Sequence, residues 1–267
     1  MKQKFTRKNV VLVLLSMAIP FAMCCGTQSM IEVRSQPKNF LPRKSAVYIE
    51  KRIDIKLCLP QSEEAKQSGV EPVCVESNLK SSGSGAVVHN SKTDNFSLVL
   101  TANHVCNMKL DFPPIFNVVR MNIVTVIIDL DGNEYSSDVL DFDEKEDICI
   151  LKVKSLKIPA VRLSMDPPEK GDRVYNLSFP AGIYGKDLVM IYEGFYDGVF
   201  SIQKTKLAAY SIYAVGGSSG SMLINGDGEL IGMIHSGLSK GGEMTFSPRY
   251  YVLHCFVTKN KILSDNY

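Results

Sequence analysis

Short stretches of alternating apolar and polar residues run through most of the chain, and no long segment has the 3.6-residue period of a helix. They fall into two series, one at residues 46–58, 85–89, 97–101, 122–130, 135–141 and 148–153, the other at 174–179, 189–196, 198–203, 207–213, 221–224, 229–236 and 250–253. A proline-containing stretch at residues 156–169 separates them. The pattern predicts an all-β protein built as a pair of antiparallel barrels or sandwiches.

Turn signals agree with this prediction. Asp131-Gly132 and Asp227-Gly228 lie between alternating stretches, as hairpin turns do. Only residues 256–263 could form a short closing helix. With 267 residues, of which 45% are hydrophobic, the chain can fill two half-size barrels.

The charge balance excludes one class of partner. The 30 Lys and Arg residues nearly match the 28 Asp and Glu residues, which leaves a formal charge of +2. Such a balance gives no field that would attract nucleic acid, so we expect no nucleic-acid partner.

The N-terminus is typical of an exported protein. Basic residues among the first eight precede an uncharged, mostly apolar run at residues 10–25. A membrane span needs about 20 such residues, and Pro20 interrupts the run, so cleavage after Cys24 or Gly26 is favoured. An uncleaved anchor at residues 10–25, which would tether the protein to a membrane, is the alternative, and lipid attachment at Cys24 or Cys25 is a third option. We expect residues 1–26 to be a signal peptide or signal anchor, residues 27–44 a linker, and the protein to be secreted or periplasmic.

Five cysteines remain if Cys24 and Cys25 leave with the signal: Cys58, Cys74, Cys106, Cys149 and Cys255. An odd number leaves at least one unpaired. Cys58 and Cys74 flank a polar loop like the ends of a hairpin, so a bridge could join them. Cys149 alternates in phase with Leu151 and Val153, which predicts a small core residue. No Cys or His spacing is typical of zinc.

Three polar residues at strand ends suggest a chemistry. His104 follows the stretch at 97–101, Asp147 opens the one at 148–153, and Ser219 lies in the loop GGSSGSM. A serine hydroxyl is a weak nucleophile unless a base takes its proton, and the base needs a group to orient it. We predict that His104 is the base and Asp147 its orienter, with Asp143 as the only rival. The backbone N–H groups of Gly217 and Ser219 would form the oxyanion hole.

The order His, Asp, Ser is that of chymotrypsin and differs from those of subtilisin and the α/β-hydrolases. The segments GSGAVV, LTANHV, DGNEYSSDVLDFDEKEDICILKV, KGDRVYNLSFPAGIYG and GGSSGSMLINGDGELIGMIHSG resemble, in order, those of the trypsin-like serine proteases of chymotrypsin fold. The similarity is greatest to the Deg/HtrA and glutamyl-endopeptidase branches and runs from about residue 46 to residue 253.

The resemblance implies two antiparallel β-barrels with the active site in the cleft between them, and neither a metal nor an organic cofactor. His104 and Asp147 would come from the first barrel, and Ser219 from the second. The implied protease domain covers residues 45–258, with barrels at about 45–157 and 158–258 and a tail at 259–267. Deg/HtrA proteins usually continue into a PDZ domain, which we do not expect here. The family's disulfide partner before the histidine is missing, so Cys106 need not be bridged.

Matching by offset to the family also indicates candidates for the substrate pocket, namely Tyr213, Ala214, Ile234, His235, Ser236 and Gly237. None is acidic, which argues against cleavage after Lys or Arg. Glutamyl endopeptidases carry a glutamate-reading histidine in this strand, but His235 is displaced by one position, and such a slip turns a side chain to the other face. We therefore expect a small or apolar residue before the cut.

These observations favour an exported serine endopeptidase that hydrolyses protein or peptide substrates through an acyl-enzyme on Ser219. The alternative is a catalytically silent protease-fold module that binds a protein partner through the same cleft. A silent module has no need of His104, Asp147, Ser219 and Gly217 together, so the enzyme is the preferred interpretation.

Overall fold

A computed structural model describes residues 40–202, 205–238 and 243–265. The predicted signal or anchor and most of the predicted linker lie outside these residues. Within the described ranges, no helix is both long enough and apolar enough to cross a membrane.

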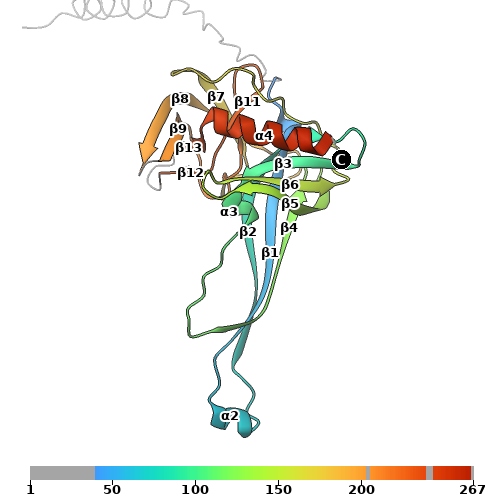
Figure 1. Cartoon of the computed structure of the whole chain (residues 1–267), viewed down its shortest axis with the longest axis vertical. Helices are drawn as coiled ribbons and strands as arrows, with labels where there is room; N and C mark the ends of the chain where they lie inside the picture. The colour runs from blue at the N-terminus through green and yellow to red at the C-terminus, as the bar shows by residue number, and fades with distance from the viewer. Residues whose placement is uncertain (1–39, 203–204, 239–242, 266–267) are drawn as a thin grey trace, which may run out of the picture. The chain divides into compact units, whose positions relative to one another are not determined.

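The first half of the chain forms a closed barrel of six antiparallel strands in the order β1-β2-β3-β6-β5-β4 (Figure 1). Its elements are η1 (Arg43–Ser45), β1 (Ala46–Cys58), α2 (Glu63–Gln67), β2 (Cys74–Asn90), β3 (Phe96–Ala102), α3 (Asn103–Cys106), β4 (Asn117–Ile128), β5 (Glu134–Asp143) and β6 (Ile148–Lys154). Strands β3 and β6 pair with each other, and every residue of β3 is buried. The predicted turn at Asp131-Gly132 joins β4 to β5, and Gly132 takes a φ of 90°, which suits glycine.

Strands β1, β2 and β4 continue past the other strands as a three-stranded arm with α2 at its tip (Figure 1). Its centre is β1, whose Ile53 and Ile55 are buried on one face. On the other face, Lys56 pairs with Glu76 at 2.9 Å. The predicted bridge between Cys58 and Cys74 is confirmed and fastens the two strands just before α2.

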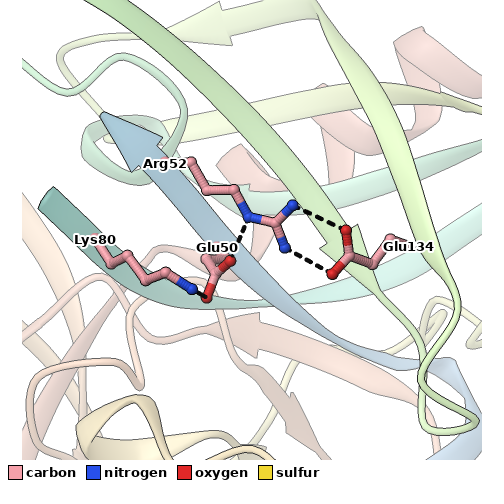
Figure 2. Close-up of polar contacts among 4 residues, drawn as sticks. All are labelled: Glu50, Arg52, Lys80 and Glu134. Atoms are coloured by element: carbon pink, nitrogen blue, oxygen red, sulfur yellow. Dashed lines mark hydrogen bonds and ion pairs between the residues drawn. The ribbon is translucent and has the colours of Figure 1, made fainter. Parts of the chain in front are cut away.

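Four charged side chains tie three strands together at the base of the arm (Figure 2). Arg52 of β1 donates two hydrogen bonds to Glu134 of β5, at 2.9 and 2.6 Å, and one to Glu50 at 2.6 Å. Lys80 of β2 donates to the other oxygen of Glu50 at 3.0 Å. Burial opposes ionisation of Glu50, but these hydrogen bonds outweigh it and lower its pKa. The network therefore keeps a mostly buried carboxylate charged.

The second half forms a seven-stranded sheet in the order β11-β10-β7-β8-β9-β13-β12. Its elements are β7 (Arg173–Ser178), η2 (Pro180–Gly182), β8 (Met190–Ile202), β9 (Thr205–Ser211), β10 (Met222–Ile224), β11 (Leu230–Met233), β12 (Ser236–Gly237) and β13 (Met244–Pro248). The amide of Met233 donates to Ser247 Oγ at 3.0 Å, so β11 meets β13 and the sheet curls toward closure. The turn at Asp227-Gly228 joins β10 to β11, as predicted.

The last described element is a helix, α4 (Tyr250–Asp265), so the predicted strand at 250–253 is wrong. Buried residues recur every three or four positions along it, at Tyr250, Leu253, Val257, Asn260 and Ser264. Polar side chains at the last two positions hide this helical period from an apolar pattern. The predicted domain limits stay predictions.

Helix α4 belongs to both halves of the fold and lies across β3 and β6 (Figure 1). Leu253 and Val257 pack in the same apolar cluster as the strands of the first barrel. Lys259 and Asn260 both donate to Asp141 of β5, at 2.9 and 3.0 Å. The helix therefore connects the end of the second sheet to the first barrel.

Candidate active site

His104 is presented by the short helix α3, directly after β3. Its side chain is 51% exposed, whereas Asn103, Val105 and Cys106 are buried. Three buried neighbours fix the backbone of α3, so the imidazole is the side chain that reaches solvent.

Asp147 lies in the turn before β6 and accepts hydrogen bonds from this short helix. One carboxylate oxygen accepts from the amide of His104 at 2.9 Å, and the other faces His104 Nδ1 at 2.7 Å. The backbone carbonyl of Asp147 accepts from the amide of Asn103 at 3.1 Å. Asp147 has a φ of 55°, an uncommon value for a residue other than glycine, so the surroundings hold a strained turn that aims the carboxylate.

The contact with Asp147 sets the state of the imidazole. With its proton on Nδ1 and donated to the carboxylate, the neutral ring leaves Nε2 as the proton acceptor. Asp143, the rival orienter, accepts from the amides of Lys145 and Glu146 instead, each at 3.0 Å. The structure therefore brings Asp147 to His104 and uses Asp143 to close the turn.

Cys106 and Cys149 form a disulfide, which corrects the expectation that Cys106 need not be bridged. Cys149 is also the buried core residue that its alternation predicts. Each cysteine lies two positions after a residue of the pair, His104 and Asp147. The bond thereby joins the two segments that carry them.

The loop of Ser219 is anchored on the first barrel by Ser84 of β2. The amide of Ser84 donates to the carbonyl of Ser219 at 2.8 Å, and its hydroxyl donates to the carbonyl of Gly217 at 2.8 Å. Thr101 of β3 donates to the carbonyl of Ser84 at 2.8 Å. These bonds fix the position of the second sheet's loop relative to the strand that precedes His104.

Gly83 lies between the segments of Ser219 and His104. A Cβ atom built on it would fall 3.4 Å from the carbonyl oxygen of Ser219 and 2.6 Å from Val105 Cγ1. The structure thus brings the carbonyl of Ser219 and the short helix that carries His104 close to the same glycine. Among the hydrogen bonds of the described residues, none joins Ser219 Oγ to His104. Such bonds are often long in unliganded enzymes and tighten only when substrate binds.

The backbone around Ser219 leaves the two amides predicted for the oxyanion hole without a described acceptor. Ser218 donates to the carbonyl of Val215 at 2.9 Å, and Gly220 donates to that of Ile234 at 2.7 Å. Over the residues that the structure describes, the amides of Gly217 and Ser219 donate to no protein acceptor. Gly217 has a φ of 91°, and a Cβ atom there would lie 2.7 Å from the carbonyl oxygen of Phe179. Only glycine fits this position without displacing neighbours.

The six pocket candidates separate into accessible and buried residues. Tyr213, Ser236 and Gly237 are exposed, whereas Ala214 and Ile234 are buried in the second apolar cluster. His235 is only 12% exposed, and its Nδ1 lies 3.7 Å from Asp147 Oδ2. Its side chain therefore faces the His104–Asp147 pair.

Sequence reasoning missed a small cavity beside His104, of about 50 Å³. Its lining is Ile49, Lys51, Ser81, Ser82, Gly83, His104, Val105 and Met108. Lys51 is buried and donates to the carbonyl of Cys106, and burial lowers its pKa. The sequence signal for this buried lysine was its position in phase with Ile49, Ile53 and Ile55 on an alternating strand. In the described part of the chain, no cluster of three or more His, Cys, Asp or Glu residues is arranged to hold a metal ion.

A closed barrel, a second curled sheet and a serine loop pinned between them define the class of chymotrypsin-fold proteins. The family profile of the trypsin-like peptidase domain matches residues 83–233, more than half of the chain. The chain therefore belongs to the trypsin-like peptidase family, and the predicted family and two-barrel fold are confirmed. No curated protein matches the sequence.

Solved structures share this fold at low sequence identity. A serine endoprotease from Yersinia pestis superposes with a TM-score of 0.57 and 15% identity, over 85% of this chain and 67% of that one. The HtrA-type protease AlgW, solved with a decapeptide, gives 0.59 and 17%, over 82% and 64%. An inactive serine-to-alanine mutant of Rv3671c from M. tuberculosis gives 0.55 and 16%, over 84% and 90%. This chain thus spans slightly less than two thirds of AlgW.

Proposed function

We propose that the protein is an exported serine endopeptidase with Ser219 as nucleophile, His104 as general base and Asp147 as orienter. The observation that carries this proposal is the 2.7 Å contact between His104 Nδ1 and Asp147, beside a serine loop with two free amides. A silent binding module would need neither the contact between His104 and Asp147 nor the free amides.

In the first half of the reaction, His104 Nε2 takes the proton of the Ser219 hydroxyl as its oxygen attacks the substrate carbonyl carbon. Asp147 stabilises the imidazolium that forms. The protonated His104 then gives its proton to the leaving amine, which yields an acyl-enzyme and a new amino terminus.

In the second half, His104 takes a proton from water, and the hydroxide equivalent attacks the acyl carbon. Return of that proton to Ser219 Oγ releases the new carboxylate and restores the free enzyme. In both tetrahedral intermediates, the amides of Gly217 and Ser219 would donate to the oxyanion.

Protein or peptide chains are the substrates that this site accommodates. AlgW is solved with a decapeptide, and the pocket candidates of this chain include no acidic side chain. Cleavage after a small or apolar residue is therefore our proposal for its preference.

Export is supported by the two disulfides, because such bonds persist in oxidising compartments and are rare in the cytosol. The apolar run at residues 10–25 fits a secretion signal, with a membrane anchor as the alternative. We propose a secreted or periplasmic protein.

The test is hydrolysis of an unstructured protein such as casein by the purified chain without its first 39 residues, followed by mass spectrometry of the fragments. The wild type should release peptides, and Ser219→Ala should release none. Ser136→Ala, an exposed serine on β5, is the matched control and should cleave at the wild-type rate. Equal cleavage by wild type and Ser219→Ala would overturn the proposal.

A further inference from the structure

His235 lies just after β11, where backbone hydrogen bonds hold it and the residue before it in place. Its amide donates to the carbonyl of Phe246 at 3.1 Å, and the amide of Ile234 donates to the carbonyl of Ser221 at 2.9 Å. The residue is thereby held beside the Ser219 loop, which limits where its ring can turn.

The ring of His235 points across to the first barrel. Its Nδ1 lies 3.7 Å from Asp147 Oδ2, the same oxygen that contacts His104 Nδ1 at 2.7 Å. One carboxylate oxygen therefore has two imidazoles as neighbours, one from each half of the fold.

The other ring nitrogen of His235 is Nε2, which lies inside the protein. Among the described residues, His235 Nε2 is enclosed and makes no hydrogen bond. A proton on Nδ1 points toward the carboxylate, whereas a proton on Nε2 would be buried without an acceptor. Electrostatics therefore favour the Nδ1–H tautomer, which directs an N–H dipole at Asp147.

We propose that His235 is a positioning residue, whose Nδ1–H holds the Asp147 carboxylate in the orientation that supports His104. The inference rests on the proposed function and extends it to a residue that takes no part in bond making.

Protonation of His235 would disturb this arrangement. Two titratable groups act on it, namely Asp147 at the start of β6 and His104 of α3. Burial lowers its pKa below the usual 6.5, His104 lowers it further, and Asp147 partly opposes both. The ring is therefore neutral near pH 7, and in acid a second imidazolium competes with His104 for one carboxylate.

The experiment measures the rate constant for labelling by a fluorophosphonate between pH 4 and pH 9, in the wild type, His235→Asn and His235→Leu. The asparagine amide can replace the N–H at Nδ1 but cannot titrate, and leucine fills the space without a donor. At pH 8, we expect His235→Leu to label about tenfold more slowly and His235→Asn to stay within about threefold of the wild type.

A second readout is the low-field proton resonance of the His104–Asp147 hydrogen bond, which should be retained in His235→Asn and shifted in His235→Leu. Near-UV circular dichroism of each variant shows whether it is folded, and His235→Asn keeps the test valid if the leucine variant is not. Equal rates in the wild type and His235→Leu, or equal slowing in both variants, would each overturn the inference. A wild type that does not label at any pH would instead refute the proposed function.

Discussion

At the scale of single residues, Asp147 contacts α3 through both its side chain and its backbone. Its carboxylate contacts His104 twice, and its backbone carbonyl accepts from the amide of Asn103, the residue before His104. The strained φ of Asp147 allows both contacts. Sequence reasoning could select His104, Asp147 and Ser219 as candidates because each lies in a short motif at a strand end. It could not place His235 or Lys51, because the direction of a side chain beside a site depends on strand register and on the loops that cover it.

We predict that Asp147→Asn lowers the rate of acylation by about 10⁴-fold with little change in the fold. An amide can donate to His104 Nδ1, which favours the tautomer with its proton on Nε2 and removes the base. Stopped-flow kinetics with an activated ester measure the rate. Asp143→Asn is the control, because that carboxylate caps a turn, and an equal loss in both variants would argue that only the turn matters.

Gly217→Ala should reduce turnover by about 10²–10³-fold, the effect of losing one oxyanion donor. The new Cβ would collide with the carbonyl oxygen of Phe179 and the amide of Gly182, at 2.7 and 2.8 Å, and would turn the Gly217 amide. The kinetic test separates kcat from KM, and we expect the loss in kcat. Gly226→Ala, which has open space, should behave as the wild type; unchanged kcat in Gly217→Ala would contradict the assignment.

At the scale of elements, one disulfide supports the candidate site and the other supports the arm. The Cys106–Cys149 bond joins α3 to β6, and the Cys58–Cys74 bond closes the arm. Alternation along the chain predicted most strands, and the hairpin loop predicted the second of these bonds. The first was missed because Cys149 alternates like a core residue, and α4 was missed because Asn260 and Ser264 occupy buried positions of its apolar face.

Removal of the Cys106–Cys149 bond, as Cys106→Ser with Cys149→Ser, should lower the free energy of unfolding by about 4 kcal/mol, the chain-entropy value for a loop of this length. It should also slow fluorophosphonate labelling, because His104 and Asp147 lose their shared support. Urea unfolding and labelling kinetics measure the two effects. The matched pair Cys58→Ser with Cys74→Ser, in the arm, should leave labelling unchanged; equal slowing in both pairs would argue against a local role.

At the scale of the whole molecule, ring stacking and a hydrogen bond join the two halves of the fold. Tyr48 of the first barrel stacks on Tyr184 of the second half at 5.3 Å, and the Tyr184 hydroxyl donates to the carbonyl of Asp129 at 2.8 Å. The two series of strands predicted two halves, but contacts between halves depend on loop conformations that no local pattern encodes. This is also why the anchoring role of Ser84 could not be predicted.

The Asp129 turn should make the stability of this contact depend on pH. Burial raises the pKa of Asp129, but hydrogen bonds from Asn133, Tyr135 and nearby amides outweigh it and hold the pKa below its ordinary value. A lowered pKa adds stability above the unfolded pKa of about 3.9 and loses it as the pH falls through the folded value. Asp129→Asn should therefore be less stable than the wild type by about 2 kcal/mol at pH 7, and the difference should vanish in strong acid. Urea unfolding between pH 2.5 and pH 7 measures it; a constant difference would contradict this account.

The most direct test of the central claim is the site at which a fluorophosphonate reacts, located by mass spectrometry of a digest of the labelled protein. The account predicts one adduct, on the peptide that contains Ser219, absent from Ser219→Ala and formed much more slowly by His104→Ala. An adduct elsewhere, or equal labelling of wild type and Ser219→Ala, would contradict it.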